Sequence, residues 1–231
     1  MSSNLRIEVA KEHEIPATAV LIARTFAGPD VETFLGNIDT PAALEATKVR
    51  HLRSWHEHMD ETGRPSVVQC IHTDPATGTE SLAACAQWFI FDKPRSPEMV
   101  EKPNYHQTGE WLSQEQGGPA KAEAIFRKMV ADRAKWSRGR GIAILQFMAT
   151  AEAFRRRGAA TMVVRWGLEE CVKAGIPAYL EASPEGVLVY EKLGFEVVDQ
   201  SYAVWEGERI PCPVMICWPP GTKASEKRPL P

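Results

Sequence analysis

The sequence predicts a mixed α/β fold (α+β) with a partly antiparallel central sheet. Strand-like apolar runs alternate with longer segments whose apolar residues recur at helical spacing. A short connection rich in turn-forming residues joins 66–73 to 81–91, which is typical of a hairpin. The chain has 231 residues, of which 44% are hydrophobic and 25% charged, and this suffices for one large domain with a substantial core.

The N-terminal part predicts a strand at Leu5–Val9 followed by two helices. Pro16 opens the first helix, which we expect to end near Gly28. A cap residue followed by proline, Thr40-Pro41, opens the second helix, and Gly63 ends it. The apolar residues expected on the inner face of this second helix are Leu44, Leu52, Trp55 and Met59.

The middle of the chain predicts an insertion at about 92–141. Residues 92–119 contain four prolines and indicate a long loop, and long loops in compact domains are often functional. Residues 120–136 predict an amphipathic helix. Its expected inward-facing residues are Ile125, Phe126, Met129 and Val130.

The C-terminal part predicts strands and helices in alternation, then a tail. Ser183-Pro184 is a second cap-plus-proline pair, which opens a short helix ending at Gly194. From Pro219 the chain is rich in Pro, Lys and Ser, and we expect residues 219–231 to be disordered. The expected strands are 142–150, 177–182, 195–205 and 212–218, and the expected long helix is 161–175.

Composition limits the classes of partner. The formal net charge of −3 and pI of about 6.1 lack the footprint of a nucleic-acid-binding protein. No apolar run reaches the length of a membrane span, and the N-terminus lacks the apolar core of a secretory signal. Five cysteines without a Cys-x-x-Cys pair predict reduced, buried thiols, and we expect a cytoplasmic protein that forms a monomer or homodimer.

A basic turn between the strand 142–150 and the helix 161–175 predicts an anion site. The turn reads Arg155-Arg156-Arg157-Gly158 and continues as Ala159-Ala160-Thr161. Backbone N–H groups at the start of a helix are free to bind an anion, and the helix dipole favours negative charge there. Arginines add charge and paired donors. The sequence therefore predicts a phosphate or pyrophosphate ligand.

Three segments resemble the GNAT acetyltransferases. The stretch MATAEAFRRRGAA resembles the family's acyl-CoA-binding pattern Gln/Arg-x-x-Gly-x-Gly/Ala, with Arg155, Gly158 and Ala160 in the fixed places. LEASPEGVLVYEKLGFEVV resembles the segment that ends in Tyr-x-x-x-Gly-Phe. LRIEVAKEHEIPATAVLIARTF is similar to the first strand and helix of the family.

The resemblance implies the GNAT fold and an acetyl-CoA cosubstrate. The fold is a mixed, mostly antiparallel twisted sheet of about seven strands with helices on both faces, here a single domain over 1–218. The pantetheine arm of CoA pairs with the end of a splayed strand, and no metal is expected. The residues expected to bind CoA are Met148, Ala149, Thr150, Arg155, Arg156, Arg157, Gly158, Ala159, Ala160, Thr161 and Ser183.

The resemblance also suggests catalytic roles. Tyr190 matches the family's general-acid tyrosine. Ser183 stands where the family often has asparagine, and two roles stay open for it, a hydroxyl for the pantetheine amide or a helix cap. A backbone N–H near Met148 or Ala149 is expected to meet the oxyanion. The general base is not identified by the sequence: Glu181 is the first candidate, and lesser ones are His72, Glu110 and ordered water.

The resemblance implies an N-acetyltransferase that moves the acetyl group of acetyl-CoA directly to a primary amine, through a tetrahedral intermediate. We expect a small-molecule amine as the acceptor, without nucleic-acid or membrane partners. Three alternatives remain. They are a protein N-terminal or lysine acetyltransferase, a non-catalytic CoA-binding sensor with the same fold, and a nucleotide-phosphate binder unrelated to CoA.

Overall fold

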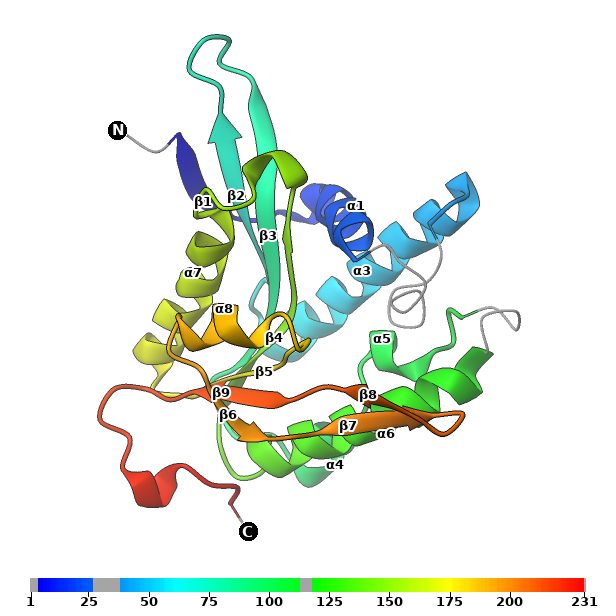
Figure 1. Cartoon of the computed structure of the whole chain (residues 1–231), viewed down its shortest axis with the longest axis vertical. Coiled ribbons are helices and arrows are strands. Elements are labelled where there is room, and N and C mark those ends of the chain that lie inside the picture. The colour runs from blue at the N-terminus through cyan, green and yellow to red at the C-terminus, as the bar shows by residue number, and fades with distance from the viewer. Residues whose placement is uncertain (1–3, 27–37, 113–117, 231) are drawn as a thin grey trace. The chain divides into compact units, whose positions relative to one another are not determined.

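The computed structural model describes residues 4–26, 38–112 and 118–230. Those residues fall into two compact units, one within the limits 1–89 and 145–167 and one within the limits 90–144 and 168–231. We call them unit 1 and unit 2, and Figure 1 shows the elements of both. This division does not test the expectation of a single domain with an insertion, which stays a prediction.

Nine strands are described, seven of them in one sheet with the order β1-β2-β3-β4-β5-β9-β6 and two in a separate sheet, β7-β8. This agrees with the predicted mostly antiparallel sheet of about seven strands. The strands are β1 Leu5–Val9, β2 Val67–Thr73, β3 Glu80–Phe91, β4 Ile142–Thr150, β5 Ala178–Glu181, β6 Glu196–Asp199, β7 Tyr202–Trp205, β8 Glu208–Pro211 and β9 Val214–Cys217.

The longer helices stand close to their predicted places. They are α1 Ile15–Thr25, α3 Pro41–Thr62, α6 Gly118–Ser137 and α7 Ala159–Ala174. The short ones are η1 Glu12–Glu14, α4 Pro97–Glu101, α5 Tyr105–Thr108, η3 Glu152–Phe154, α8 Val187–Glu191 and η4 Ala224–Glu226. The predicted end of the first helix near Gly28 lies outside the described residues.

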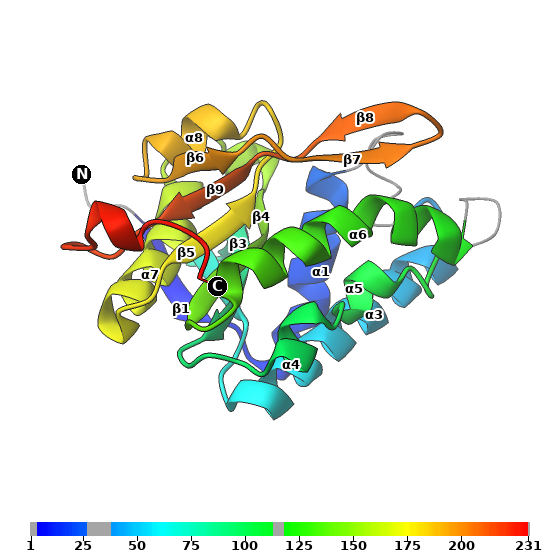
Figure 2. The ribbon, with the colours of Figure 1, turned by 90° about the horizontal axis from the view of Figure 1, so that it is seen from below.

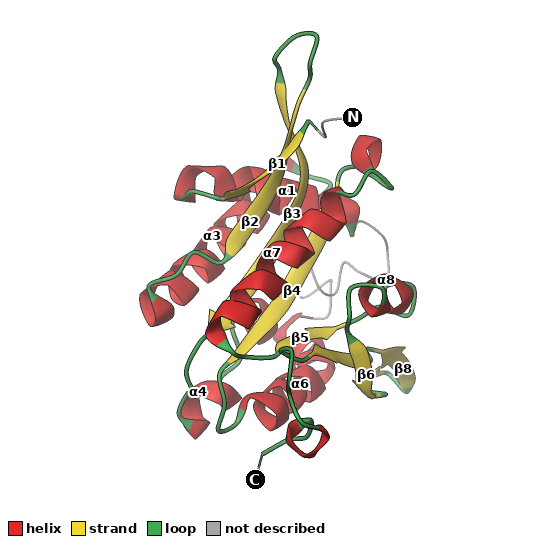
Figure 3. Ribbon diagram, turned by 90° about the vertical axis from the view of Figure 1, so that its left-hand side faces the viewer, coloured by secondary structure: helices red, strands yellow, loops and turns green. Residues whose placement is uncertain are grey.

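In unit 1, helices cover both faces of the antiparallel strands β1, β2 and β3 (Figure 3). Successive side chains of a strand point to opposite faces, so Cys85 and Trp88 of β3 face different layers. The Cys85 thiol lies 3.8 Å from the Thr18 carbonyl oxygen of α1. The Trp88 indole N–H donates to the Val163 carbonyl oxygen of α7 at 3.3 Å.

The close contact between β3 and α7 depends on Gly167. A Cβ atom built at Gly167 would stand 2.1 Å from the indole of Trp88, which is fully buried. Glycine therefore lets the helix approach the largest side chain on this face of the strand. The predicted helix 161–175 is confirmed, and its first turn begins two residues earlier than expected.

Helix α3 begins and ends as predicted but buries a different face. The Thr40 hydroxyl accepts the Ala43 N–H at 3.1 Å, and Gly63 takes the left-handed conformation at the C-terminus. Of the predicted inner face only Trp55 is buried, while Leu44, Leu52 and Met59 are half-buried. A mostly polar row shares the buried face with Trp55, namely Thr47, Arg50, His51, Ser54 and His58.

In unit 2, the insertion contains two short helices that the sequence pattern did not reveal. Ser96 caps α4 and Asn104 caps α5, each by accepting a backbone N–H three residues later. The long helix α6 runs beside them (Figure 2), and Glu101 of α4 pairs with Arg138 after α6 at 2.7 Å. The expected inward residues Ile125 and Phe126 are buried.

The predicted strand 195–205 is wrong, because the chain bends between β6 and β7. The Ser201 hydroxyl donates to Asp132 of α6 at 2.5 Å, and the Ser201 carbonyl accepts the Cys212 N–H at 2.9 Å. Held at Ser201, the chain forms the separate hairpin β7–β8, which lies against α6 (Figure 2). Strand β9 then returns to the sheet and pairs with both β5 and β6.

The tail expected to be disordered has a described course up to Leu230. It contains the 3-10 helix η4, and the Arg140 guanidinium donates to the Arg228 carbonyl at 2.5 Å. Lys227 pairs with Glu196 at 3.2 Å. No helix within 4–26, 38–112 or 118–230 is long and apolar enough to span a bilayer.

Candidate functional site

The basic turn of unit 1 has the backbone geometry of an anion-binding loop. Helix η3 ends at Phe154, and two of the next four residues take left-handed conformations, Arg156 with φ of 59° and Gly158 with φ of 89°. Turns of this kind form concave groups of backbone N–H donors that bind anions. A Cβ built at Gly158 would meet no atom within 4 Å, so the space beside this backbone is open.

Helix α7 starts directly from this turn and presents free N–H groups. The Met162 N–H donates to the Gly158 carbonyl oxygen at 3.1 Å, which closes the first helical turn. The N–H groups of Ala159, Ala160 and Thr161 precede that bond and have no acceptor within the helix. Ala159 is buried, with 1% of its surface exposed, so the start of the helix is anchored within unit 1.

Three guanidinium groups surround this turn without acidic partners. Arg155, Arg156 and Arg157 are exposed. Among the residues that the structure describes, no carboxylate forms an ion pair with any of them, and the one ring contact joins Arg157 to Phe154 at 6.0 Å. In a chain with a net charge of −3, this cluster of positive charge is local and not part of a generally basic chain.

The end of β4 carries the other residues expected to contact CoA. Ala149 is fully buried in a cluster with Ile22 and Cys85, whereas Met148 and Thr150 are half-buried. The ladder between β4 and β5 comprises the pairs Ala143–Ala178 and Ile144–Tyr179, so among the described residues it does not extend to the end of β4. The Ala151 N–H donates to the Ala83 carbonyl at 2.9 Å and ties the strand end to β3.

Unit 2 contains the predicted general acid. Tyr190 lies on α8, its ring packs edge-on against Phe195 at 5.8 Å between centroids, and Gly186 lies against the same ring. No hydrogen-bond partner of its hydroxyl is found among the described residues. Burial raises the pKa of Tyr190 to about 12, so the phenol keeps its proton at neutral pH.

Ser183 precedes α8 and is exposed. Its hydroxyl accepts the Gly186 N–H at 3.2 Å, which is a cap-like bond in the turn before the helix. The helix itself begins at Val187, three residues later than the expected first position at Pro184. The N-cap of α8 is Gly186, which has no side-chain cap, so Ser183 stabilises the preceding turn and not the helix end that the sequence predicted. Its exposed hydroxyl stays accessible for a second bond, and the role toward the pantetheine amide stays a prediction.

Glu181 is held in a buried ion pair. Both of its oxygens accept from Arg133 of α6, at 2.7 and 2.6 Å, and the Tyr179 hydroxyl donates to Oε1 at 3.0 Å. The side chains of Arg133 and Glu181 are 6% and 5% exposed. Burial lowers the pKa of Arg133, but the charge and hydrogen bonds of Glu181 outweigh it and leave that pKa raised. The role of Glu181 as the general base stays a prediction, and its carboxylate already neutralises the buried charge of Arg133.

The other candidates for the base belong to different units. His72 is half-buried on β2 beside Phe154, and Glu110 is exposed in the insertion. The thiol of Cys85 is fully buried, and burial raises its pKa to about 12, so it is not a nucleophile at neutral pH. No local pattern in the sequence marks Arg133, because its partner Glu181 lies 48 residues away.

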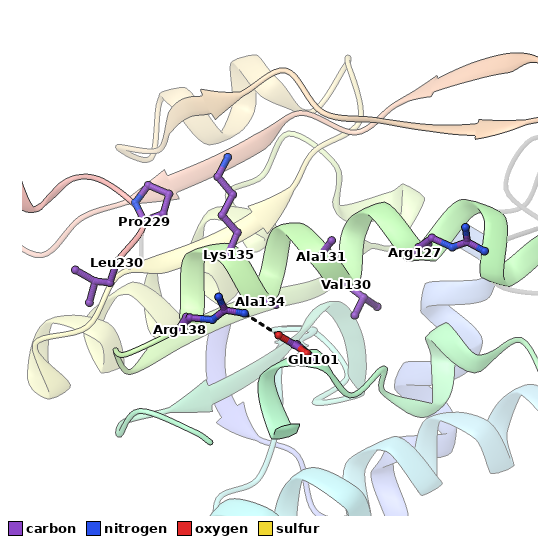
Figure 4. A pocket seen from close by; sticks show the side chains of 9 residues that line it. All are labelled: Glu101, Arg127, Val130, Ala131, Ala134, Lys135, Arg138, Pro229 and Leu230. Atoms are coloured by element: carbon purple, nitrogen blue, oxygen red, sulfur yellow. Dashed lines mark hydrogen bonds and ion pairs between the residues drawn. The ribbon is translucent and has the colours of Figure 1, made fainter. Parts of the chain in front are cut away.

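A groove of about 410 Å³ in unit 2 offers a contrast to the arginine turn (Figure 4). Its cations are Arg127, Lys135 and Arg138, and each pairs with a carboxylate at 2.7 to 2.9 Å. Pro229 and Leu230 of the tail form another wall. Since its charges are compensated within the protein, we assign it no ligand.

Comparison with known proteins places the arginine turn in a recognised family segment. Residues 126–195 match the model of the acetyltransferase (GNAT) family. A stretch of 75 residues is 33% identical to the probable acyltransferase SID5 of Ajellomyces capsulatus, and this match spans 32% of the present chain and 55% of that protein.

Solved structures share the fold. Arylalkylamine N-acetyltransferase 2 of Aedes aegypti superposes with a TM-score of 0.59 and 12% identity, over 94% of this chain and 99% of that one. A protein of Corynebacterium glutamicum described as histone acetyltransferase HPA2 and related acetyltransferase gives a TM-score of 0.54 and 17% identity, over 95% and 98%. The predicted resemblance to the GNAT acetyltransferases is therefore confirmed for the segment 126–195, and the solved structures confirm the predicted fold.

Proposed function

We propose that this chain, which carries a GNAT-family segment in a GNAT fold, is an N-acetyltransferase that uses acetyl-CoA and a small primary amine. The observation that carries the proposal is the turn 155–161, where three exposed arginines have no ion pair with any described residue. They and the first backbone N–H groups of α7 lie around Gly158, beside which the space is open. A pyrophosphate matches this set of donors in charge and in the number of bonds it can accept.

The chain's own residues divide the work in this proposal. Gly158 to Thr161 and the arginines bind the pyrophosphate, and Met148 to Thr150 line the pantetheine arm with their backbone. A backbone N–H near Met148 or Ala149 stabilises the oxyanion. Acetyl-CoA supplies an activated thioester, whose thiol leaves with a pKa near that of cysteine, about 8.5.

Tyr190 acts as the general acid that protonates the departing thiolate. A tyrosine that stays protonated at neutral pH can perform this role, and burial keeps the pKa of Tyr190 at about 12. A positioned acid typically contributes a factor of about 10² to 10⁴ in rate. Ser183 offers its exposed hydroxyl to an amide of the pantetheine arm.

The acceptor amine must lose a proton before it attacks. An alkylammonium with a pKa near 10.4 is about a thousandth deprotonated at pH 7, which costs roughly 4 to 5 kcal/mol. Because Arg133 occupies the Glu181 carboxylate, we assign proton removal to ordered water in place of that residue. We further propose a cytoplasmic location and a monomeric or homodimeric state.

Release of free thiol from acetyl-CoA across a panel of small amines and peptides tests the proposal. We expect release with small primary amines and a loss of about 10² to 10⁴ in kcat for Tyr190→Phe, with little change in the KM for acetyl-CoA. Tyr202→Phe on the exposed hairpin is the matched control and should leave kcat unchanged.

The same panel separates the alternatives. Acetylation of peptides but not of small amines indicates a protein acetyltransferase. Tight CoA binding without thiol release, and without an effect of Tyr190→Phe, indicates a non-catalytic sensor. Thermal protection by ATP but not by CoA contradicts the proposal altogether, because it indicates a different nucleotide.

A further inference from the structure

An aromatic pair stands next to the arginine turn in unit 1. Phe154 is the last residue of η3, immediately before Arg155, and His72 lies on β2. Their rings are 4.9 Å apart between centroids, with an angle of 43°. The Arg157 guanidinium lies 6.0 Å from the centre of the Phe154 ring. Two half-buried rings in contact with each other and one cation therefore lie together beside the turn.

The backbone holds this pair firmly. His72 pairs with Leu5 on one side and with Ser81 on the other, so it belongs to a central strand of unit 1. The Phe154 N–H donates to the Ala151 carbonyl at 2.9 Å, and Ala151 is bonded to Ala83 of β3. Both rings are half-buried, so each keeps an exposed part. An aromatic surface that is fixed before the ligand arrives loses little conformational entropy on binding.

We propose that Phe154 and His72 form the platform for the adenine ring of CoA, with Arg157 at its edge. This inference rests on the proposed function, because it assumes that the pyrophosphate lies at 155–161. A purine is joined to its phosphates by a short ribose, so the base must lie close to the phosphate site. Aromatic rings bind bases by stacking, and an arginine adds a cation–π contact.

With this platform, the protein selects its acyl donor through contacts with the adenosine part of CoA. A thioester of 4′-phosphopantetheine carries the same reacting group and one phosphate but lacks the adenosine. The platform therefore favours acetyl-CoA over carriers that present only the phosphopantetheine arm. The nucleotide fragment 3′,5′-ADP, which lacks the arm, should bind by itself.

Calorimetric titration with CoA, 4′-phosphopantetheine and 3′,5′-ADP tests the inference. For Phe154→Ala we expect the Kd of CoA and of 3′,5′-ADP to rise about 5- to 100-fold, and the Kd of 4′-phosphopantetheine to stay within about twofold. His72→Ala should act in the same direction with a smaller effect. Phe154→Tyr keeps a ring and should bind all three ligands as the wild type does.

The outcomes separate the inference from the function on which it rests. If CoA binds but Phe154→Ala weakens CoA and 4′-phosphopantetheine equally, the adenine platform is wrong and the acetyl-CoA proposal survives. If the wild-type protein binds 3′,5′-ADP no better than Phe154→Ala does, the platform is again wrong. If the wild-type protein binds none of the three ligands, the proposed function fails and the platform fails with it. An unchanged melting temperature of Phe154→Ala ensures that the comparison concerns binding.

Discussion

The buried Arg133 and the three arginines of the turn 155–157 differ in whether a carboxylate of the protein neutralises their charge. Arg133 of unit 2 is buried and bonded to both oxygens of Glu181, at 2.7 and 2.6 Å. Arg155, Arg156 and Arg157 of unit 1 are exposed, and no carboxylate among the described residues pairs with them. The charge of Arg133 is neutralised within the protein, and the ion pair stabilises the fold. The three arginines of the turn keep their charge available for an anionic ligand.

The largest expected effect is on stability, at the compensated pair. Arg133→Met leaves the Glu181 carboxylate buried beside Tyr179 without its cation, and we expect the free energy of unfolding to fall by about 3 to 5 kcal/mol. The double change Arg133→Met with Glu181→Leu should recover most of this loss, because it removes both buried charges. Denaturant unfolding of the three proteins measures this, and a loss under about 1 kcal/mol for Arg133→Met contradicts the structural role.

A second stability effect is expected at the contact of α7 with β3. Gly167→Ala places a methyl group 2.1 Å from the Trp88 ring. Overpacking of this kind costs about 1 to 3 kcal/mol, and alanine's better helix propensity recovers at most about 1 kcal/mol. We expect a lower melting temperature with acetyl-CoA binding by the folded protein intact. A melting temperature at or above that of the wild type contradicts the packing argument.

In contrast to Gly167→Ala, substitution of Gly158 should weaken CoA binding more than it lowers stability. Its φ of 89° makes Gly158→Ala cost about 1 to 2 kcal/mol in backbone strain, and the methyl group points into the space where the pyrophosphate is expected. We expect the Kd of CoA to rise about 10-fold or more in calorimetry. Gly78→Ala is the matched control, since Gly78 has a φ of 72° with no atom near its Cβ position, and it should keep the wild-type Kd.

The smallest expected effect concerns pH. Burial raises the pKa of Tyr190 to about 12, above the ordinary value of 10. A raised pKa means that the stability from the neutral phenol is complete below about pH 10 and is lost as pH rises toward 12. The general acid therefore stays protonated, and kcat should lose less than about twofold to its ionisation between pH 7 and 10. An alkaline limb near pH 8 to 9 that disappears in Tyr190→Phe contradicts this assignment.

The parts of the molecule that the sequence predicted are those defined by neighbouring residues. The arginine turn, the cap at Thr40 and the stop at Gly63 each depend on backbone geometry within a few positions, so local patterns are sufficient. The strands of the 66–91 hairpin were predicted for the same reason. The family motifs are local as well, and they led to the fold.

The parts that the sequence did not predict depend on partners far along the chain. The ion pair of Arg133 joins residues 48 positions apart, and the bend at Ser201 depends on Asp132, 69 positions away. The buried face of α3 was also misjudged, because an apolar count ignores buried polar residues such as Ser54 and His58. No local pattern marks these positions.

Titration of CoA into the wild-type protein and into a triple variant, with Arg155→Gln, Arg156→Gln and Arg157→Gln, tests the central claim most directly. If the uncompensated arginines hold the pyrophosphate, the triple variant should bind CoA at least about 100-fold more weakly, with a reduced dependence of Kd on salt. Its free energy of unfolding should change by less than about 0.5 kcal/mol, because these side chains are exposed. Wild-type affinity for CoA in the triple variant would contradict the claim.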